Sequence, residues 1–256
     1  MLDGKFDAAP LWLIGILLFL LLALFFRLGV WLRSRGKHGE GRTDDEGYLL
    51  SAALALLGLL IAFTFSLALN RYDNRRNLVV QEANAIGTAW LRAGLIEGDT
   101  GRHLQRSIAR YADVRLDLPK SADDMHVARI ETYTARMQSQ LWQEMKTDIA
   151  SLPAPIATTL IAAMNEMFDI AASRKAEREA RIPPDILLVL VLCTAMSAAI
   201  IGYVLGNTGR SHRTVTTILF ALLTLALLMI LDLDRPWRGT ITVSQQPMLD
   251  MRAGLR

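Results

Sequence analysis

The sequence contains a single cysteine, Cys193, and four histidines that stand far apart. One cysteine cannot form a disulfide or a thiolate metal site within the chain, and Cys193 lies in an apolar run, as a small buried hydrophobic residue would. The histidines, His38, His103, His126 and His212, lack metal-ligand spacing, and no HExxH, GxSxG, Walker or GxGxxG motif is present. We therefore expect no enzyme activity, and no catalytic residue, metal site or cofactor.

The sequence also lacks a strong excess of charge of either sign. Its 28 basic and 25 acidic residues leave a formal net charge of +3. These charges are mixed through the segments between apolar blocks and form no basic face. Nucleic acid is therefore not expected as a partner.

Hydrophobic residues are abundant, at 52% of the chain with a mean hydropathy of +0.28. They gather in four blocks, and crossing about 30 Å of hydrocarbon takes roughly 20 helical residues. We predict membrane spans at residues 11–33, 48–70, 186–205 and 214–231. The first block is longer than the apolar core of a signal peptide and no small-x-small site precedes Arg27, so we expect it to be retained. The lipid bilayer is thus the first expected partner.

Residues 71–182, between the second and third predicted spans, show amphipathic helical periodicity. Two stripes carry it: Leu78, Glu82, Ile86 and Trp90, and then Ile130, Tyr133, Met137, Leu141, Met145 and Ile149. Breaks at Gly98 and Gly101, at Pro119, and at Pro153 and Pro155 divide the segment into about four helices. The predicted fold class is all-α, with four transmembrane helices, a helical extramembrane domain between spans 2 and 3, and a tail over residues 232–256.

Membrane orientation is not decided by the basic residues. Arg33, Arg35, Lys37 and Arg42 in the first loop, with Arg210 and Arg213 in the third, favour a cytoplasmic side for these short loops and place the helical domain outside. Basic residues at the membrane-adjacent ends of the domain favour the opposite arrangement. The two counts conflict, and both orientations stay open.

The second span carries a stripe of small and weakly polar residues at four-residue spacing: Gly58, Ala62, Ser66 and Asn70. Close helix packing of the small-xxx-small kind explains such a stripe, and so does a pore-lining face at the axis of an oligomer. Ile61 and Phe65 share a face at the same spacing, where they are either packed or an apolar constriction. The sequence leaves both alternatives open.

Beyond the second span, Arg71 and Arg75 follow one turn apart with no helix breaker between them. In an oligomer they would form a basic ring at a pore mouth, which attracts anions. The alternative is ordinary interfacial anchoring, with Asp73 as a local partner. Further along, Ala198, Gly202 and Gly206 of the third span predict a helix-contact face.

After the fourth span, Asp232 and Asp234 stand close to Arg235 and Arg238 in the sequence. Opposite charges at this spacing predict a salt-bridged turn where the chain leaves the membrane.

Several segments together resemble the DUF4239 family of bestrophin-like bacterial membrane proteins. They are LIAFTFSLALNRYDNRR at residues 60–76, VQEANAIGTAWLR at 80–92, LDLDRP at 231–236 and VSQQP at 243–247. The resemblance implies a homopentamer in the bacterial inner membrane, with a central ion pore lined by the second span. Carried onto this chain, it makes Ile61, Phe65, Ser66 and Asn70 the candidate pore-lining residues, with Arg71 and Arg75 at the mouth. No acidic cluster matches a calcium clasp, so calcium gating is not carried over.

The leading functional expectation is a bestrophin-like homo-oligomeric channel that passes small inorganic ions, anions in particular because of the basic mouth. The alternative is a non-conducting membrane scaffold or signal-sensing protein whose helical domain binds a partner or ligand. The absence of buried charge in spans 2 to 4 weakens a transporter more than a channel.

Overall fold

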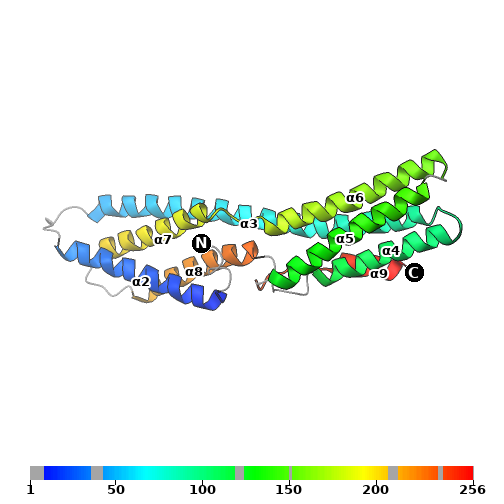
Figure 1. Ribbon diagram of the computed structural model, residues 1–256. Coiled ribbons are helices and arrows are strands. Elements are labelled where there is room, and N and C mark those ends of the chain that lie inside the picture. Colours follow the sequence, from blue (N-terminus) through cyan, green and yellow to red (C-terminus); the bar gives the residue numbers. More distant parts are fainter. Residues whose placement is uncertain are drawn as a thin grey trace. The chain divides into compact units, whose positions relative to one another are not determined.

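The structure is a computed structural model that describes residues 9–35, 43–118, 124–149, 152–206, 213–235 and 239–255. These residues are almost entirely helical and contain no strand (Figure 1). The helices are α2 (Leu11–Arg35), α3 (Thr43–Ala93), α4 (Gly98–Asp117), α5 (Asp124–Asp148), α6 (Ala154–Glu179), α7 (Pro184–Leu205), α8 (Arg213–Asp234) and α9 (Gln246–Gly254). The predicted all-α fold class is confirmed. Of the residues considered above, Lys37, His38, Arg42, Pro119, Arg210, His212 and Arg238 lie outside the described part.

Four helical segments are long and apolar enough to cross a membrane: Leu11–Arg35, Glu46–Ala93, Ala154–Leu205 and Arg213–Asp234. The third joins α6 and α7, and its apolar part is α7. The chain is therefore a multi-pass membrane protein. It divides into two compact units, a membrane unit (Met1–Arg71, Arg181–Arg235 and Gly239–Ile241) and a helical unit (Tyr72–Ala180, Pro236–Arg238 and Thr242–Arg256).

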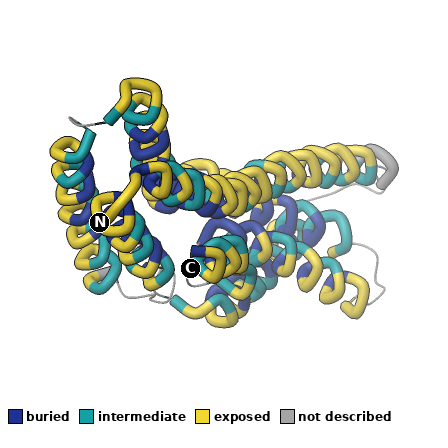
Figure 2. The backbone as a smooth tube through the Cα atoms, turned by 90° about the vertical axis from the view of Figure 1, so that its right-hand side faces the viewer, coloured by how far each residue is buried: buried dark blue, intermediate teal, exposed yellow. Residues whose placement is uncertain are grey.

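In the membrane unit, α2 packs against α7 and α8. Leu22, Ala198, Ile201 and Phe220 form the buried centre of this packing, and the rings of Phe26 and Phe220 meet edge to face at 5.8 Å. Such edge-to-face pairs add a specific geometry to apolar burial. Figure 2 shows buried residues on one side of the helices and exposed residues on the other.

Glycines make the contact between α2 and α7 close. A Cβ atom on Gly29 would lie 1.9 Å from the carbonyl oxygen of Ala199, and one on Gly202 would lie 2.1 Å from that of Phe26. Ala198 is fully buried beside them. Each helix thus presents a glycine to the other's backbone, as membrane helices do when they pack closely. This confirms the helix-contact face predicted for the third span.

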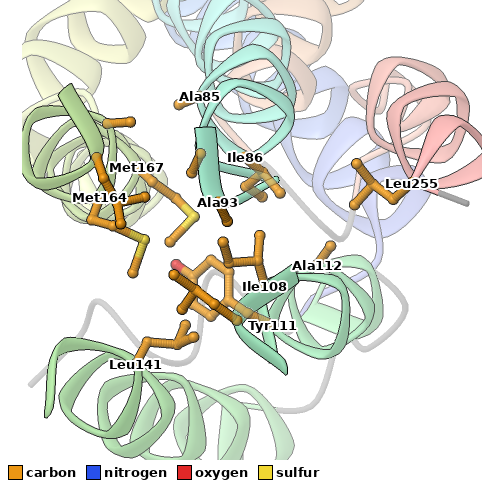
Figure 3. Packing of buried hydrophobic residues seen from close by; sticks show 14 of the residues in the cluster. Ala85, Ile86, Ala93, Ile108, Tyr111, Ala112, Leu141, Met164, Met167 and Leu255 are labelled. Carbon is orange, nitrogen blue, oxygen red and sulfur yellow. The ribbon is translucent and has the colours of Figure 1, made fainter. Parts of the chain in front are cut away.

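The helical unit has its own apolar core, built from the second part of α3 together with α4, α5, α6 and α9. Figure 3 shows Ile86 of α3, Ile108 and Tyr111 of α4, Leu141 of α5 and Met164 of α6 converging on one centre. The predicted stripe of α5 supplies Met137, Leu141 and Met145 to this core. Tyr133, predicted in the same stripe, is instead 52% exposed, because the polar Thr134 beside it is the residue that turns inward.

At the end of α8, the two aspartates of the predicted salt-bridged turn accept hydrogen bonds from backbone N–H groups. Asp232 accepts hydrogen bonds from the backbone N–H groups of Thr240 and Ile241, at 2.7 and 3.1 Å, and from the Thr240 hydroxyl. Asp234 accepts one from the backbone N–H of Ile182 at 3.0 Å. Both carboxylates are buried. They act as acceptors for backbone N–H groups, which need a hydrogen-bond partner when they are removed from water.

Candidate functional site

The second predicted span belongs to a single unbroken helix, α3, which covers Thr43–Ala93. No proline or glycine interrupts the sequence between Gly58 and Gly87, so every backbone N–H in this stretch can reach its carbonyl one turn earlier. The helix ends at Ala93, and α4 begins at Gly98, which has a positive φ of 82° that residues with a side chain rarely adopt. The first part of α3 belongs to the membrane unit and the second to the helical unit.

One face of α3 in the membrane unit is exposed and lined by small or uncharged polar side chains. These small or polar residues are Ala55, Gly58, Ala62, Ser66 and Asn70, and the larger Leu59 and Leu69 are exposed among them. A Cβ added to Gly58 would meet no atom within 4 Å. The stripe therefore does not pack against another helix of the same chain among the described residues.

The opposite face of the same helix turns inward. Leu57, Thr64 and Ala68 are buried there. The Thr64 hydroxyl donates a hydrogen bond to the carbonyl of Leu60 at 2.8 Å, which satisfies it within its own helix. The buried residues and the exposed residues each recur at helical spacing. The open face therefore extends along the whole span.

The candidate pore-lining residues do not all share this open face. Ser66 and Asn70 lie on it and are exposed, whereas Ile61 and Phe65 are half-buried. Ile61 and Phe65 still share a side with each other at four-residue spacing. The structure thus brings Ser66 together with Asn70, and Ile61 together with Phe65.

The two candidate mouth residues differ in exposure. The Arg71 side chain is half-buried, and that of Arg75 is 7% exposed; both have interactions within the chain. Ser66 and Arg75 are nine residues apart, which puts them on opposite sides of an α-helix with about 3.6 residues per turn. Their roles at a pore mouth stay predictions.

The exposed surfaces of the other spans are mainly apolar. Large apolar side chains are exposed there, among them Leu17 and Leu20 of α2, Leu188 and Leu192 of α7, and Leu222 of α8. Such surfaces suit contact with lipid chains. On α3, exposed Leu59 and Phe63 accompany the small residues, but Ser66 and Asn70 add polar groups that lipid would not satisfy.

A second group of polar residues, which the sequence analysis did not single out, lies inside the helical unit. Glu82 of α3 is fully buried and paired with Arg115 of α4 and Arg174 of α6, both also buried. The signal in the sequence was the position of Glu82 within the apolar stripe that runs from Leu78 to Trp90. A carboxylate at such a position must be paired, because burying it alone costs too much free energy.

No group of three or more potential metal ligands of the His, Cys, Asp or Glu type occurs among the residues that the structure describes. Two polar features of the described residues are considered further below: the open face of α3 and the buried cluster around Glu82.

Comparison with known proteins identifies one family and one fold. A family model for the bestrophin-like domain matches residues 16–248. A bacterial bestrophin homologue from Klebsiella pneumoniae has a similar structure, with a TM-score of 0.65 at 14% identity over 93% of this chain and 98% of its own. A substituted variant of a homologue from that organism gives 0.68 at 14% identity, covering 96% and 99%. No curated protein sequence matches the chain. At identities this low, the structural similarity shows a shared fold and nothing further.

Proposed function

The chain belongs to the bestrophin-like family, and on this basis we propose that it assembles into a homo-oligomeric ion channel whose pore is lined by α3. The observation that carries the proposal is the open face of α3, where Ser66 and Asn70 expose polar groups in a span without charged residues. In a single chain these groups would face lipid. A ring of subunits would instead turn them toward water and ions at a shared axis.

The proposal gives the two pairs of residues on α3 different roles. Ser66 and Asn70 offer a hydroxyl and an amide, which can replace part of the hydration shell of an ion. Ile61 and Phe65, half-buried on a neighbouring side, are the candidate apolar constriction. The combination resembles the polar and hydrophobic elements from which selective pores are built.

We further propose that the permeating ions are small anions. The amide N–H groups of Asn70 are hydrogen-bond donors, and Arg71 follows directly at the end of the charge-free segment. Donors and positive charge near a pore entrance raise the local concentration of anions. We retain a homopentamer in the bacterial inner membrane, within the DUF4239 group of bestrophin-like proteins, as the assembly and location that the resemblance implies.

Recording from purified protein in planar bilayers tests this function. With a chloride gradient, we expect a current whose reversal potential lies close to the chloride equilibrium potential. Asn70→Asp replaces the amide donors by a carboxylate, so it should reduce the anion current or shift the reversal potential toward the cation. Thr217→Ala removes an exposed hydroxyl from α8 and is the matched control, expected to leave both unchanged. The absence of conductance at any voltage would contradict the proposal.

A further inference from the structure

The helical unit contains a buried ionic cluster that the proposed channel function does not use. Glu82 has a side chain that is 0% exposed, and that of Arg115 is 1% exposed. The Nε of Arg115 donates to Oε1 of Glu82 at 2.5 Å, and Nη1 of Arg174 donates to Oε2. Both oxygens of the single carboxylate are therefore engaged by guanidinium groups from two other helices.

The charges in this cluster do not balance. One carboxylate faces two guanidinium groups, and the remaining contact of Arg174, from Nη2 to Oε1 of Gln245 at 2.6 Å, is to a neutral amide. Tyr111, one turn before Arg115, cannot supply the missing negative charge. Burial raises its pKa to about 12, although Arg115 acts to lower it, so the phenol is neutral near pH 7. One positive charge is left over.

Neither deprotonation nor the next acidic residue removes this excess. Burial acts to lower the pKa of Arg115, but the negative charges of Glu82 and the more distant Glu131 raise it above its usual value. At Arg174 burial prevails over Glu82 and lowers the pKa, but a guanidinium is not deprotonated in proteins, so both arginines stay charged. Glu131 brings its own cations, because it lies 2.8 Å from Nη1 of Arg178 and 3.8 Å from Nζ of Lys175.

An unsatisfied donor lies at the same place. The Nη2 of Arg115 is buried and has no hydrogen-bond partner among the described residues. Buried polar groups in folded proteins are almost always paired, and a buried N–H of a charged group left unpaired is especially unfavourable. A water molecule would satisfy the donor but leave the charge uncompensated, whereas an anion would do both.

We propose that Arg115 forms a binding site for a small monovalent inorganic anion, of the chloride class, inside the helical unit. The anion accepts from Nη2 of Arg115 and neutralises the excess charge of the Glu82–Arg115–Arg174 cluster. It is small because the donor atom is buried, in a side chain that is only 1% exposed. The site is separate from the open face of α3, and its occupancy makes the stability of the helical unit depend on anion concentration.

Thermal unfolding of the full chain in detergent, with sodium chloride exchanged for sodium gluconate at constant ionic strength, tests the site. We expect the unfolding temperature of the natural sequence to rise with chloride and to saturate. Glu82→Gln raises the excess from one charge to two, so half-saturation should need several-fold less chloride. Arg115→Gln leaves a neutral Glu82–Arg174 pair, and the chloride dependence should disappear.

Arg252→Gln is the matched control, because it removes an arginine of the same unit that is paired with Asp113 at the surface. It should keep the chloride dependence of the natural sequence. As a second measurement, crystals grown in bromide should show an anomalous peak within hydrogen-bonding distance of Nη2 of Arg115. A peak there supports the site even where a variant unfolds.

The inference is overturned if chloride has no more effect than gluconate on both the natural sequence and Glu82→Gln. It is also overturned if Arg115→Gln keeps the full chloride effect, because the anion then binds elsewhere, or if the bromide map shows only water at Nη2. None of these outcomes bears on conduction, and a protein that binds chloride here without conducting would contradict only the channel proposal.

Discussion

The carboxylate of Asp232 holds the segment around Thr240 and Ile241 by accepting hydrogen bonds from their backbone N–H groups. Asp232→Ala removes the acceptor of these N–H groups, and the net loss is about 0.5–1.5 kcal/mol for each hydrogen bond. We expect a clearly lower unfolding temperature in detergent. Asp250→Ala removes an exposed carboxylate bonded to Gln246 and should change little. Equal effects of the two substitutions would contradict this role.

Tyr111 gives the helical unit a pH-dependent stability at high pH. Burial raises its pKa from 10.0 to about 12, so the folded state retains the phenolic proton longer than the unfolded state does. The associated stability is complete below about pH 10 and is lost as pH rises toward 12. Tyr111→Phe should therefore unfold with a shallower decline between pH 10 and 12, measured by circular dichroism during thermal unfolding. An unchanged slope would assign the decline to other groups.

The partners of individual buried side chains were the least predictable feature of the structure from the sequence. The periodicity placed Glu82 on a buried face, but its partners Arg115 and Arg174 are 33 and 92 residues away along the chain, and no spacing rule connects such distances. Likewise, Asp232 and Asp234 stand next to arginines in the sequence, and nothing there indicated the hydrogen bonds that both accept from backbone N–H groups. A buried carboxylate binds whatever donor the fold brings to it.

At the scale of elements, the crossing of α2 and α7 depends on the absence of side chains at two positions. At Gly202 a Cβ would lie 2.1 Å from the carbonyl oxygen of Phe26, which is backbone and cannot move aside without moving the helix. We expect Gly202→Val to destabilise the membrane unit by about 1–3 kcal/mol or more, as overpacking does. Chemical denaturation in detergent micelles measures this loss.

The control for this crossing is Gly47→Ala in α3, where an added Cβ would meet nothing within 4 Å. It should unfold like the natural sequence. Equal stability of Gly202→Val and Gly47→Ala would show that the helices cross at a larger distance than the structure gives.

The positions of the helices were predicted better than the roles of single residues, because the sequence pattern that indicates a helix lies within the helix itself. A run of about 20 apolar residues predicts a span by length alone, and four spans with a helical domain after the second were expected and found. The exposure of Tyr133 was missed, because the spacing of the stripe did not show that the polar Thr134 beside it would be the buried residue. For the stripe on α3, the sequence left packing and pore lining open, and the structure shows no packing partner within the described chain.

At the scale of the whole molecule, the proposed function requires several copies of the chain. Images of detergent-solubilised particles should show a closed ring with an axial opening, since a single α3 cannot enclose a pore. We expect five subunits, as the resemblance implies. A dimer without an axial opening would instead favour the scaffold or signal-sensing alternative.

The central claim is that the open face of α3 lines an ion pathway, and a cysteine-modification experiment tests it most directly. In a Cys193→Ser background, Ser66→Cys is compared with Thr217→Cys on α8, and a charged, water-soluble thiol reagent is added during bilayer recording. We predict that the current of Ser66→Cys falls sharply after modification while that of Thr217→Cys is unchanged. A current that persists in modified Ser66→Cys, or falls equally in both proteins, would contradict the claim.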